Sequence, residues 1–282
     1  MDKISRRQFF VRGTTACLCL SGLGAGLNTA HADSHLSKSI EKYGGFKMGL
    51  QSYSLRRLNL KRTIESVSEL GLHWVEFFPG HFGVTTDESR IAEVKDLLAP
   101  HDMHMYVHGV HGFGGDAEAN RRIFEFAKLA GISLISAHPA SNSFESLNDL
   151  VQEFDIKIGI HNHGPGHTYD LIEDSLKAVE PWDKRIGFCP DTGHCMRSGE
   201  NPVDMVLQMK ERLYGMHLKD HAHIGRDEPP ETILGEGAID LPGLCAALRE
   251  IGFDHPISLE YELGSPMDGI RKGLSNFAAA AN

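Results

Sequence analysis

The stretch IGFCPDTGHC, from Ile186 to Cys195, places an apolar run directly before an acid and a histidine. Side chains alternate along an extended segment, so Cys189 and Asp191 share one face, opposite Phe188. The apolar face is expected to be buried, and the other face ends in a carboxylate. This stretch therefore predicts a strand that delivers a titratable group to its carboxyl end.

Three further segments repeat this arrangement, in which a small residue precedes two polar ones on the same face. Because four strands share the pattern, their polar faces are expected to line one common interior. The segments are IGIHNH with His161 and His163, YGMHLK with His217 and Lys219, and ISLEYE with Glu260 and Glu262.

The composition bounds the class of protein. With 282 residues, 41% of them apolar, the chain can bury a large core as one domain. The formal net charge of −10 makes nucleic acid an unfavourable partner and suits a small neutral substrate. The residues do not indicate an oligomeric state.

The first 32 residues resemble a twin-arginine export signal. Arg6 and Arg7 precede a weakly apolar stretch rich in Gly and Ala, which closes with a small-residue site at Ala32. This stretch is too short and too rich in glycine to span a membrane. We expect cleavage after Ala32, a periplasmic or otherwise exported protein, and no stable membrane anchoring. Residues 33–45 are then a polar linker, and residues 46–282 form the folded domain.

Removal of residues 1–32 takes away four basic groups and one acidic group, so the net charge moves from −10 to −13. Three cysteines remain, Cys189, Cys195 and Cys245. An odd number of cysteines without paired spacing predicts no disulfide framework, even in an oxidising compartment. The fold is therefore expected to depend on its core.

After residue 45, eight β-type runs alternate with amphipathic helical patterns, which predicts an α/β fold with a parallel sheet. Helical patterns stop at Gly71, before Pro100, at Gly131 and at Gly252. Eight such pairs can close into a (β/α)8 TIM barrel with its active site at the carboxyl ends of the strands. The expected strands are Met48–Ser54, Trp74–Phe78, Met103–His108, Leu134–Ala137, Ile158–His161, Ile186–Cys189, Tyr214–Leu218 and Ile257–Glu260.

A doubly wound open sheet is the competing architecture. It would place a glycine-rich phosphate turn after its first strand, and none follows Ser54. The Gly112–Gly115 segment lies three strands into the chain without the dinucleotide spacing, which indicates a flexible loop. The longest connection without a helix, from Lys219 to about Ala238, follows His217 directly and is expected to be a lid or binding loop.

Four strand ends carry a donor set suited to a metal. His161, Asp191, His217 and Glu260 offer two imidazoles and two carboxylates, which suit one divalent cation such as manganese, zinc or cobalt. Each of these residues alone is equally explained as a hydrogen-bonded polar group at the mouth of a barrel, but four together favour a metal. Further candidates on inward faces are Glu76, His108, His138, His163, His194, Lys219 and Glu262.

The strand ends DTGH at Asp191–His194 and HLKD at His217–Asp220, with the late GEGAID and ISLEYE segments, resemble the xylose-isomerase-like barrel superfamily. The resemblance covers nearly all of the mature chain. Members include sugar isomerases and epimerases, inosose dehydratases, lyases acting on oxidised glycosides, and abasic-site endonucleases. The resemblance implies a carbohydrate-processing enzyme with a small-molecule sugar substrate.

In the epimerase branch of that family, the metal takes a glutamate, an aspartate, a histidine and a glutamate from the last four strands. Asp191, His217 and Glu260 match this pattern, whereas His161 stands where the family has the first glutamate. The change keeps a metal ligand but removes one carboxylate of the acid/base pair. This pattern still allows metal-assisted enolisation, with Glu260, His163 or another histidine taking the proton.

The enolate has two outcomes. Reprotonation gives isomerisation or epimerisation, and expulsion of a leaving group gives dehydration or β-elimination from a keto sugar or 3-keto glycoside. The sequence predicts an enzyme of the isomerase or epimerase type, with the lyase or dehydratase as the alternative. Catalytic roles are assigned to Glu260 and His163. Substrate contacts are assigned to His108, His138, His194, Lys219 and Glu262.

Two other classes of protein agree less well with the sequence. An abasic-site endonuclease would need a glutamate that bridges metals where His161 stands, and the acidic mature surface would repel a phosphate backbone. A non-catalytic sugar-binding module would favour aromatic platforms and few metal ligands, but the chain has only two tryptophans. The catalytic interpretation is therefore preferred.

Overall fold

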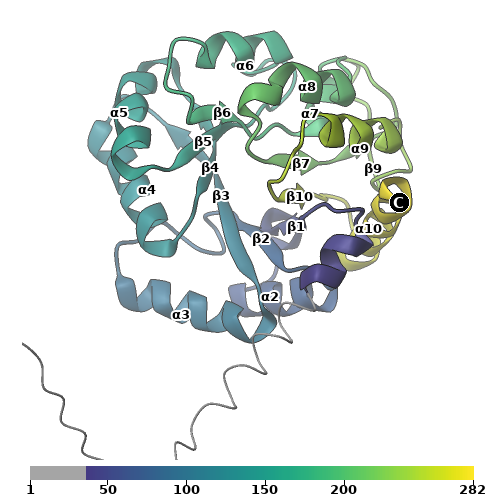
Figure 1. Cartoon of the computed structure of the whole chain (residues 1–282), viewed down its shortest axis with the longest axis horizontal. Coiled ribbons are helices and arrows are strands. Elements are labelled where there is room, and N and C mark those ends of the chain that lie inside the picture. The colour runs from purple at the N-terminus through teal and green to yellow at the C-terminus, as the bar shows by residue number, and fades with distance from the viewer. Residues whose placement is uncertain (1–35) are drawn as a thin grey trace, which may run out of the picture.

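The structure is a computed structural model that describes residues 36–282. The export signal expected at residues 1–32 lies outside the described residues. Eight parallel strands form one sheet in the order β6-β5-β4-β3-β2-β1-β10-β7, with the helices around it (Figure 1). The strands are β1 (Met48–Gln51), β2 (Trp74–Phe77), β3 (His104–Phe113), β4 (Leu134–Pro139), β5 (Lys157–Ile160), β6 (Ile186–Phe188), β7 (Met216–Leu218) and β10 (Ile257–Leu259).

The two edge strands of this sheet, β6 and β7, meet and close it. Parallel bridges join Phe188 to Leu213 and Asp191 to His217. The His217 amide donates to the Pro190 carbonyl at 2.8 Å. The eight predicted strands therefore form one closed barrel, and the predicted (β/α)8 architecture is confirmed.

Helices follow the strands where the sequence predicts them. Asn59, Asp87, Asp116 and Asp240 cap α2, α3, α4 and α9 with side-chain oxygens that accept backbone amides. Gly131 ends α4 in the left-handed region at φ 81°. The helices are α2 (Leu60–Glu69), α3 (Glu88–Leu98), α4 (Ala117–Ala130), α5 (Phe144–Phe154), α6 (Ile172–Val179), α7 (Thr192–Arg197), α8 (Pro202–Met209), α9 (Leu241–Glu250) and α10 (Pro266–Ala281), with short 3-10 turns η1 (Ser52–Leu55), η2 (Ala99–His101), η3 (Ser141–Ser143) and η4 (Lys210–Arg212).

The largest differences from the predicted strand boundaries are at the ends of β1 and β3, and the other boundaries agree or shift by one or two residues. The first strand ends at Gln51, because the Gln51 side chain accepts the Tyr53 amide at 3.1 Å and starts the turn η1. Strand β3 continues to Phe113, because β4 offers it partners as far as Pro139. The register between these two strands shifts between His108 and His111.

Small residues let the strands close tightly. A Cβ atom on Gly159 would lie 2.6 Å from Cys189 Cβ, and one on Gly215 would lie 2.8 Å from Leu134 Cδ2. Val107, Leu134 and Cys189 form a separate buried cluster. The faces predicted to share an interior therefore do so, and the polar residues at the ends of the same strands are brought to one end of the barrel.

Part of the expected linker is packed on the barrel. Residues 36–42 form a helix, and Tyr43 is buried with its ring 6.3 Å from that of Phe277 on α10. The Asn282 side chain donates to the Lys42 carbonyl at 3.0 Å, so the two ends of the described chain lie together. Within residues 36–282, none of the helices has both the length and the apolar character needed to cross a membrane.

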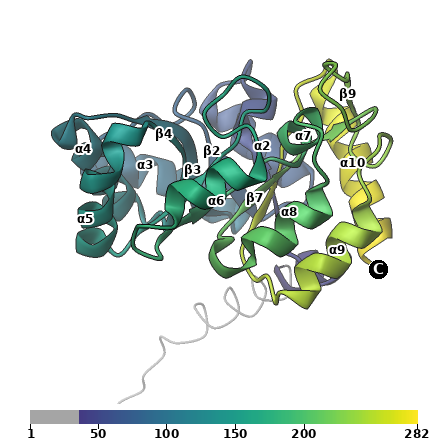
Figure 2. The same cartoon turned by 90° about the horizontal axis from the view of Figure 1, so that it is seen from above.

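The long connection after β7 carries a two-stranded hairpin, β8 (Asp220–His221) with β9 (Glu231–Thr232). Figure 2 shows this connection beside α7 and α10. The Asp220 carboxylate accepts the amides of Gly235, Gly237 and Ile239 at 2.9, 3.0 and 3.1 Å. The loop that the sequence predicted as a lid or binding loop is thus fixed at its base by the buried Asp220.

Candidate active site

A cavity of about 370 Å³ opens at the carboxyl ends of the strands. This volume is in the range of small-molecule sites. A larger hollow of about 490 Å³ lies against Lys95 and Met103, near the start of β3, and contains none of the predicted site residues. We therefore place the candidate site in the first cavity. It is lined by Gln51, Tyr53, Phe78, Pro79, Gly109, Val110, His161, His163, His194, Glu260 and Glu262.

Asp191 is oriented by the start of α7. Its Oδ1 atom caps the helix by accepting the His194 amide at 2.8 Å. Its own amide donates to the Asn162 side chain at 2.8 Å. The other carboxylate oxygen, Oδ2, is buried and has no hydrogen-bond partner within residues 36–282. Capping thus uses one oxygen and leaves the second free for a ligand.

His161 provides a second atom of this kind, because its Nδ1 is buried without a hydrogen-bond partner in the described chain. His161, Asp191 and His217 each offer one donor atom, and these atoms all lie within 4.8 Å of one another. Burial, together with the neighbouring His217, holds the pKa of His161 well below its usual value, so the ring is neutral. Buried donors without partners are costly, and a divalent cation would satisfy them. The residues present fit a metal.

His217 is held at both ring nitrogens. Nδ1 lies 3.0 Å from Glu260 Oε2, and Nε2 lies 2.8 Å from Glu76 Oε2. Burial alone would lower the pKa of His217, but the Glu76 charge and the hydrogen bonds raise it well above the usual value. Glu260 does not belong to the three-residue group and adjoins it through His217. Three of the four predicted ligands therefore meet directly, and the fourth lies beside them.

Glu76 on β2 is a buried carboxylate that the sequence placed on an inward face without assigning it a role. Its Oε1 accepts the Ser136 hydroxyl at 2.6 Å, and its Oε2 accepts the Ser258 hydroxyl at 2.8 Å. These contacts anchor a buried carboxylate against His217. Such outer partners fix the orientation and tautomer of a metal-binding histidine.

Lys219 brings a buried positive charge to the site. Its Nζ lies 2.6 Å from Glu262 Oε1 and 3.8 Å from both Asp191 Oδ2 and Glu260 Oε2. Burial would lower the pKa of Lys219, but the surrounding carboxylates raise it above the usual value. In return, Lys219 and His217 hold the pKa of Glu260 low, although burial would raise it. Glu260 is therefore an ionised carboxylate on the cavity wall.

The remaining histidines differ in their position. His163 and His194 line the cavity. Burial, with His194 and His138 nearby, lowers the pKa of His163 to about 3, so this ring is neutral. His138 and Lys219 were also predicted as substrate contacts, but neither lines the cavity, and His138 lies behind His163 with 2.9 Å between their Nδ1 atoms.

His108 does not lie where the sequence predicted. Its Nε2 lies 2.8 Å from the Phe82 carbonyl oxygen and its Nδ1 lies 2.7 Å from His111 Nε2, so both nitrogens are used inside the protein. It is absent from the cavity wall. The assignment of His108 as a substrate contact is therefore corrected. The cause is packing, because the ring of His108 lies against the rings of Phe82 and Phe126, with centroids 6.0 and 4.9 Å away.

Glu231, on strand β9 of the hairpin, was not predicted from the sequence to lie near the candidate site. Its Oε1 accepts the Glu262 amide at 2.8 Å, and burial raises the pKa of its carboxyl to about 7. The chain places it in a loop without a periodic pattern, so only its position in space reveals its connection to Glu262.

The family model described as xylose isomerase-like TIM barrel matches residues 64–280. The chain belongs to this family. An inosose dehydratase of Lacticaseibacillus casei is 28% identical over 137 residues, which are 43% of this chain and 46% of that protein. The chain thus spans about half the length of the curated relatives it matches.

Two solved structures share the fold more completely. The 3-keto-D-glucoside 4-epimerase YcjR of E. coli superposes with a TM-score of 0.67 at 16% identity, covering 83% of this chain and 99% of that one. The IOLI protein with a bound zinc atom superposes with a TM-score of 0.65 at 19% identity, covering 84% and 96%. At these identities the likeness is one of fold.

Proposed function

We propose that the protein is a divalent-metal-dependent carbohydrate enzyme that forms an enolate from a keto sugar or sugar derivative. The observation that carries this proposal is the group of His161, Asp191 and His217 beside a cavity of about 370 Å³, in which the buried atoms His161 Nδ1 and Asp191 Oδ2 make no hydrogen bond within the described residues. The names of the relatives, an inosose dehydratase and a 3-keto-glucoside epimerase, belong to the same chemistry.

His161, Asp191 and His217 would hold the cation, with Glu260 completing the set. A bound divalent cation supplies a Lewis acid that polarises a ketone and acidifies the neighbouring C–H. Glu76 accepts from Nε2 of His217, so Nδ1, which lies against Glu260, is the nitrogen that would give up its proton to a cation. Lys219 offsets the negative charge of Asp191 and Glu260 when no cation is bound.

Glu260 is the proposed base, because it is ionised and lines the cavity. His163, a neutral imidazole on the same wall, is the second proposed proton carrier. His194 and Glu262 line the cavity as proposed substrate contacts, and Lys219 positions Glu262 through their 2.6 Å ion pair. His138 supports the ring of His163 from behind.

Elimination is the outcome that we favour for the enolate. The second carboxylate of a two-base epimerase is replaced by His161, whose ring is neutral and buried. Glu262, the other carboxylate on the wall, is paired with Lys219 and is not free to act as an equivalent base. Epimerisation or isomerisation through the same enolate is the second candidate, since His163 can return a proton.

The test is to incubate the purified protein with a keto sugar, a 3-keto glycoside and the matching non-keto glycoside, before and after chelation and after adding manganese, zinc or cobalt. We expect conversion of the keto substrates only, dependent on metal, with release of water or of the aglycone. Asp191→Asn should lose activity, and His104→Ala, an exposed change at the start of β3, should keep it. Full activity in the chelated protein would overturn the proposal.

We also infer that residues 1–32 are a twin-arginine export signal, which would deliver the folded protein to the periplasm. Support comes from the paired arginines and the small-residue site at Ala32. Replacing Arg6 and Arg7 by Lys should retain the protein in the cytoplasm. Undiminished export of that variant would contradict the inference.

A further inference from the structure

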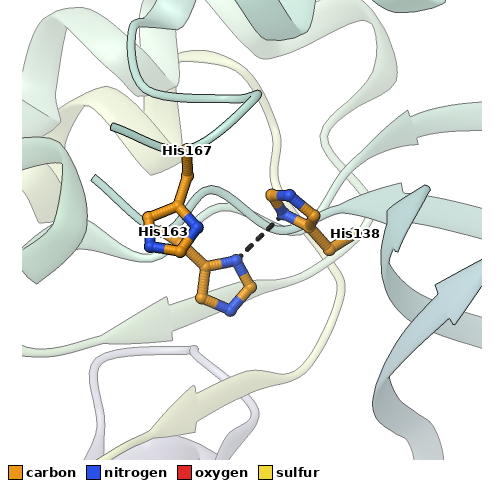
Figure 3. Close-up of side chains that lie close together, drawn as sticks. All are labelled: His138, His163 and His167. Atoms are coloured by element: carbon orange, nitrogen blue, oxygen red, sulfur yellow. Dashed lines mark hydrogen bonds between the residues drawn. The ribbon is translucent and has the colours of Figure 1, made fainter. Parts of the chain in front are cut away.

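Beside the group of His161, Asp191 and His217, a second cluster contains histidine alone. His138 stands near the end of β4, and His163 and His167 stand in the loop after β5. Each ring offers one nitrogen, and these three nitrogens lie within 4.8 Å of one another. Figure 3 shows the three rings gathered around one space, with the Nδ1 atoms of His138 and His163 facing each other.

The spacing of the rings suits shared coordination. The two Nδ1 atoms are 2.9 Å apart. The ring centroids are 4.7 Å apart for His138 and His163, 5.3 Å for His163 and His167, and 6.0 Å for His138 and His167. His138 Nδ1 also lies 3.3 Å from the His161 carbonyl oxygen, which can only accept, so His138 Nδ1 carries a proton and faces both acceptors. A cation bound here would replace that proton and use one lone pair from each of the three rings.

The chain around the cluster holds these rings in place. Gly164 and Gly166 adopt the left-handed region at φ 80° and 84°, and the His167 amide donates to the Gly164 carbonyl at 3.3 Å. This turn returns His167 toward His163, which lies four residues before it in the chain. The ring of Tyr169 packs against His138 at 4.9 Å, and its hydroxyl donates to the Pro139 carbonyl.

The far end of the same loop is also anchored. Asp170 accepts the Ser198 hydroxyl at 2.6 Å and the Arg226 guanidinium at 2.7 Å. His167 itself is exposed, whereas His138 and His163 are partly buried. The cluster is therefore fixed by its surroundings and open to solvent on one side.

We propose that His138, His163 and His167 bind a second divalent cation of the zinc class. Three imidazoles with one open position are a donor set that zinc uses at catalytic sites. The short spacing of His163 and His167 also matches zinc sites in which two histidines come from one turn. Because His167 is exposed, a fourth position on this cation would be open to a water molecule or a substrate oxygen.

The second cation changes the part that His163 plays. A metal on Nδ1 fixes the ring proton on Nε2, at the opposite side of the ring. His163 then donates a hydrogen bond to the substrate, and Glu260 is left as the base. This inference goes beyond the proposed function, which requires only the cation of His161, Asp191 and His217.

The experiment measures the stoichiometry of zinc binding. The purified protein is stripped with a chelator, titrated with zinc alone, and its bound metal is counted by native mass spectrometry and calorimetry. Two zinc ions are expected for the wild type and for the exposed control His104→Ala. His167→Ala, a substitution at an exposed residue, should bind only the zinc ion of His161, Asp191 and His217. Its affinity for the zinc ion at the histidine cluster should fall by more than the 10–100-fold that is typical of losing an outer partner.

His161→Ala separates this proposal from the proposed function, because it should also bind one zinc ion, at the His167 cluster. A wild type that binds a single ion, lost in His161→Ala and kept in His167→Ala, overturns the second site and leaves the proposed function standing. A single ion lost in His167→Ala and kept in His161→Ala supports the second site and overturns the first. Binding of no zinc overturns both.

Discussion

The Nε2 atom of His217 lies 2.8 Å from Oε2 of Glu76, and both side chains are buried. The contact joins β2 to β7 across the barrel interior. Ser136 and Ser258 donate to the same carboxylate from β4 and β10, so four strands converge on Glu76. This acid connects the packing of the barrel to the orientation of a candidate ligand.

Glu76→Gln should weaken metal binding about 10–100-fold, the range expected when the partner of a metal-binding histidine is lost. The amide keeps the shape of the side chain but removes the charge that fixes the proton of His217. Competition with a chromophoric chelator measures the affinity. Ser258→Ala is the matched control, because it removes one donor to Glu76 and leaves the contact with His217; it should bind metal almost as the wild type does. Equal affinities for Glu76→Gln and wild type would contradict the assigned role.

The barrel could be predicted from the sequence because its signals are local. Alternation of side chains places Asp191 and His217 on inward faces, and glycine stop signals such as Gly131 mark the ends of helices. The position of His108 could not be predicted in this way, because it depends on contacts with Phe82 and Phe126, which are distant in the chain. Glu231 could not be found either, because a hairpin in a long loop brings it to Glu262.

The roles within the site were predicted less completely than its location. The alternation pattern cannot show that Asp191 caps α7 with its Oδ1 atom, or that Glu76 contacts Nε2 of His217. These facts depend on contacts between elements that are distant in the chain. The spacing of His163 and His167 was visible in the sequence, but only the position of His138 gives it meaning.

Asp220→Ala should loosen the connection after β7. The substitution leaves the amides of Gly235, Gly237 and Ile239 without their acceptor. Each hydrogen bond to a charged group contributes about 1.5–3 kcal/mol, so the loop should open more often and the free energy of unfolding should fall by a few kcal/mol. Hydrogen exchange at the three amides is the direct measurement. Asp227→Ala, which removes an exposed partner of His223, should leave their exchange unchanged; equal protection in both variants would argue against the anchor.

The buried pair His108 and His111 should make the protein sensitive to acid. Burial lowers the pKa of His108 to about 3 and that of His111 to about 4, from 6.5. Between pH 6.5 and 4 the unfolded chain therefore binds more protons than the folded one. As the pH is lowered through this range, the free energy of unfolding should therefore decrease by about 1.4 kcal/mol per pH unit for each of the two histidines.

Thermal or urea unfolding of chelated protein across this range measures the slope. His111→Phe removes one of the two groups and should give a shallower fall below pH 6.5. His104→Phe, an exposed change on the same strand, should keep the slope of the wild type. Identical slopes for His111→Phe and wild type would show that the pair does not titrate as its burial indicates.

His161→Glu tests whether the site has been rebuilt for elimination. The histidine is buried and neutral, with its ring 4.7 Å from those of both His163 and His217. A glutamate there restores the family's carboxylate and adds negative charge beside Asp191 and Glu260. It should keep or strengthen metal binding, since a carboxylate is also a metal ligand.

The two interpretations of this position predict opposite changes in activity. If this chain has only lost one base of the two-base mechanism and has gained no other activity, His161→Glu should create or restore epimerase activity without abolishing another function. If the site performs one-base elimination, the added carboxylate should return the proton to the enolate before the leaving group departs. Elimination should then fall by about 10²–10⁴-fold, the usual contribution of a positioned proton carrier. The assay follows a 3-keto glycoside for release of its aglycone or water, with both proteins at the same metal occupancy. A wild type that only interconverts free sugars, without an elimination product, would decide for epimerisation, because the enolate would then be reprotonated faster than it expels its substituent even with His161 in place.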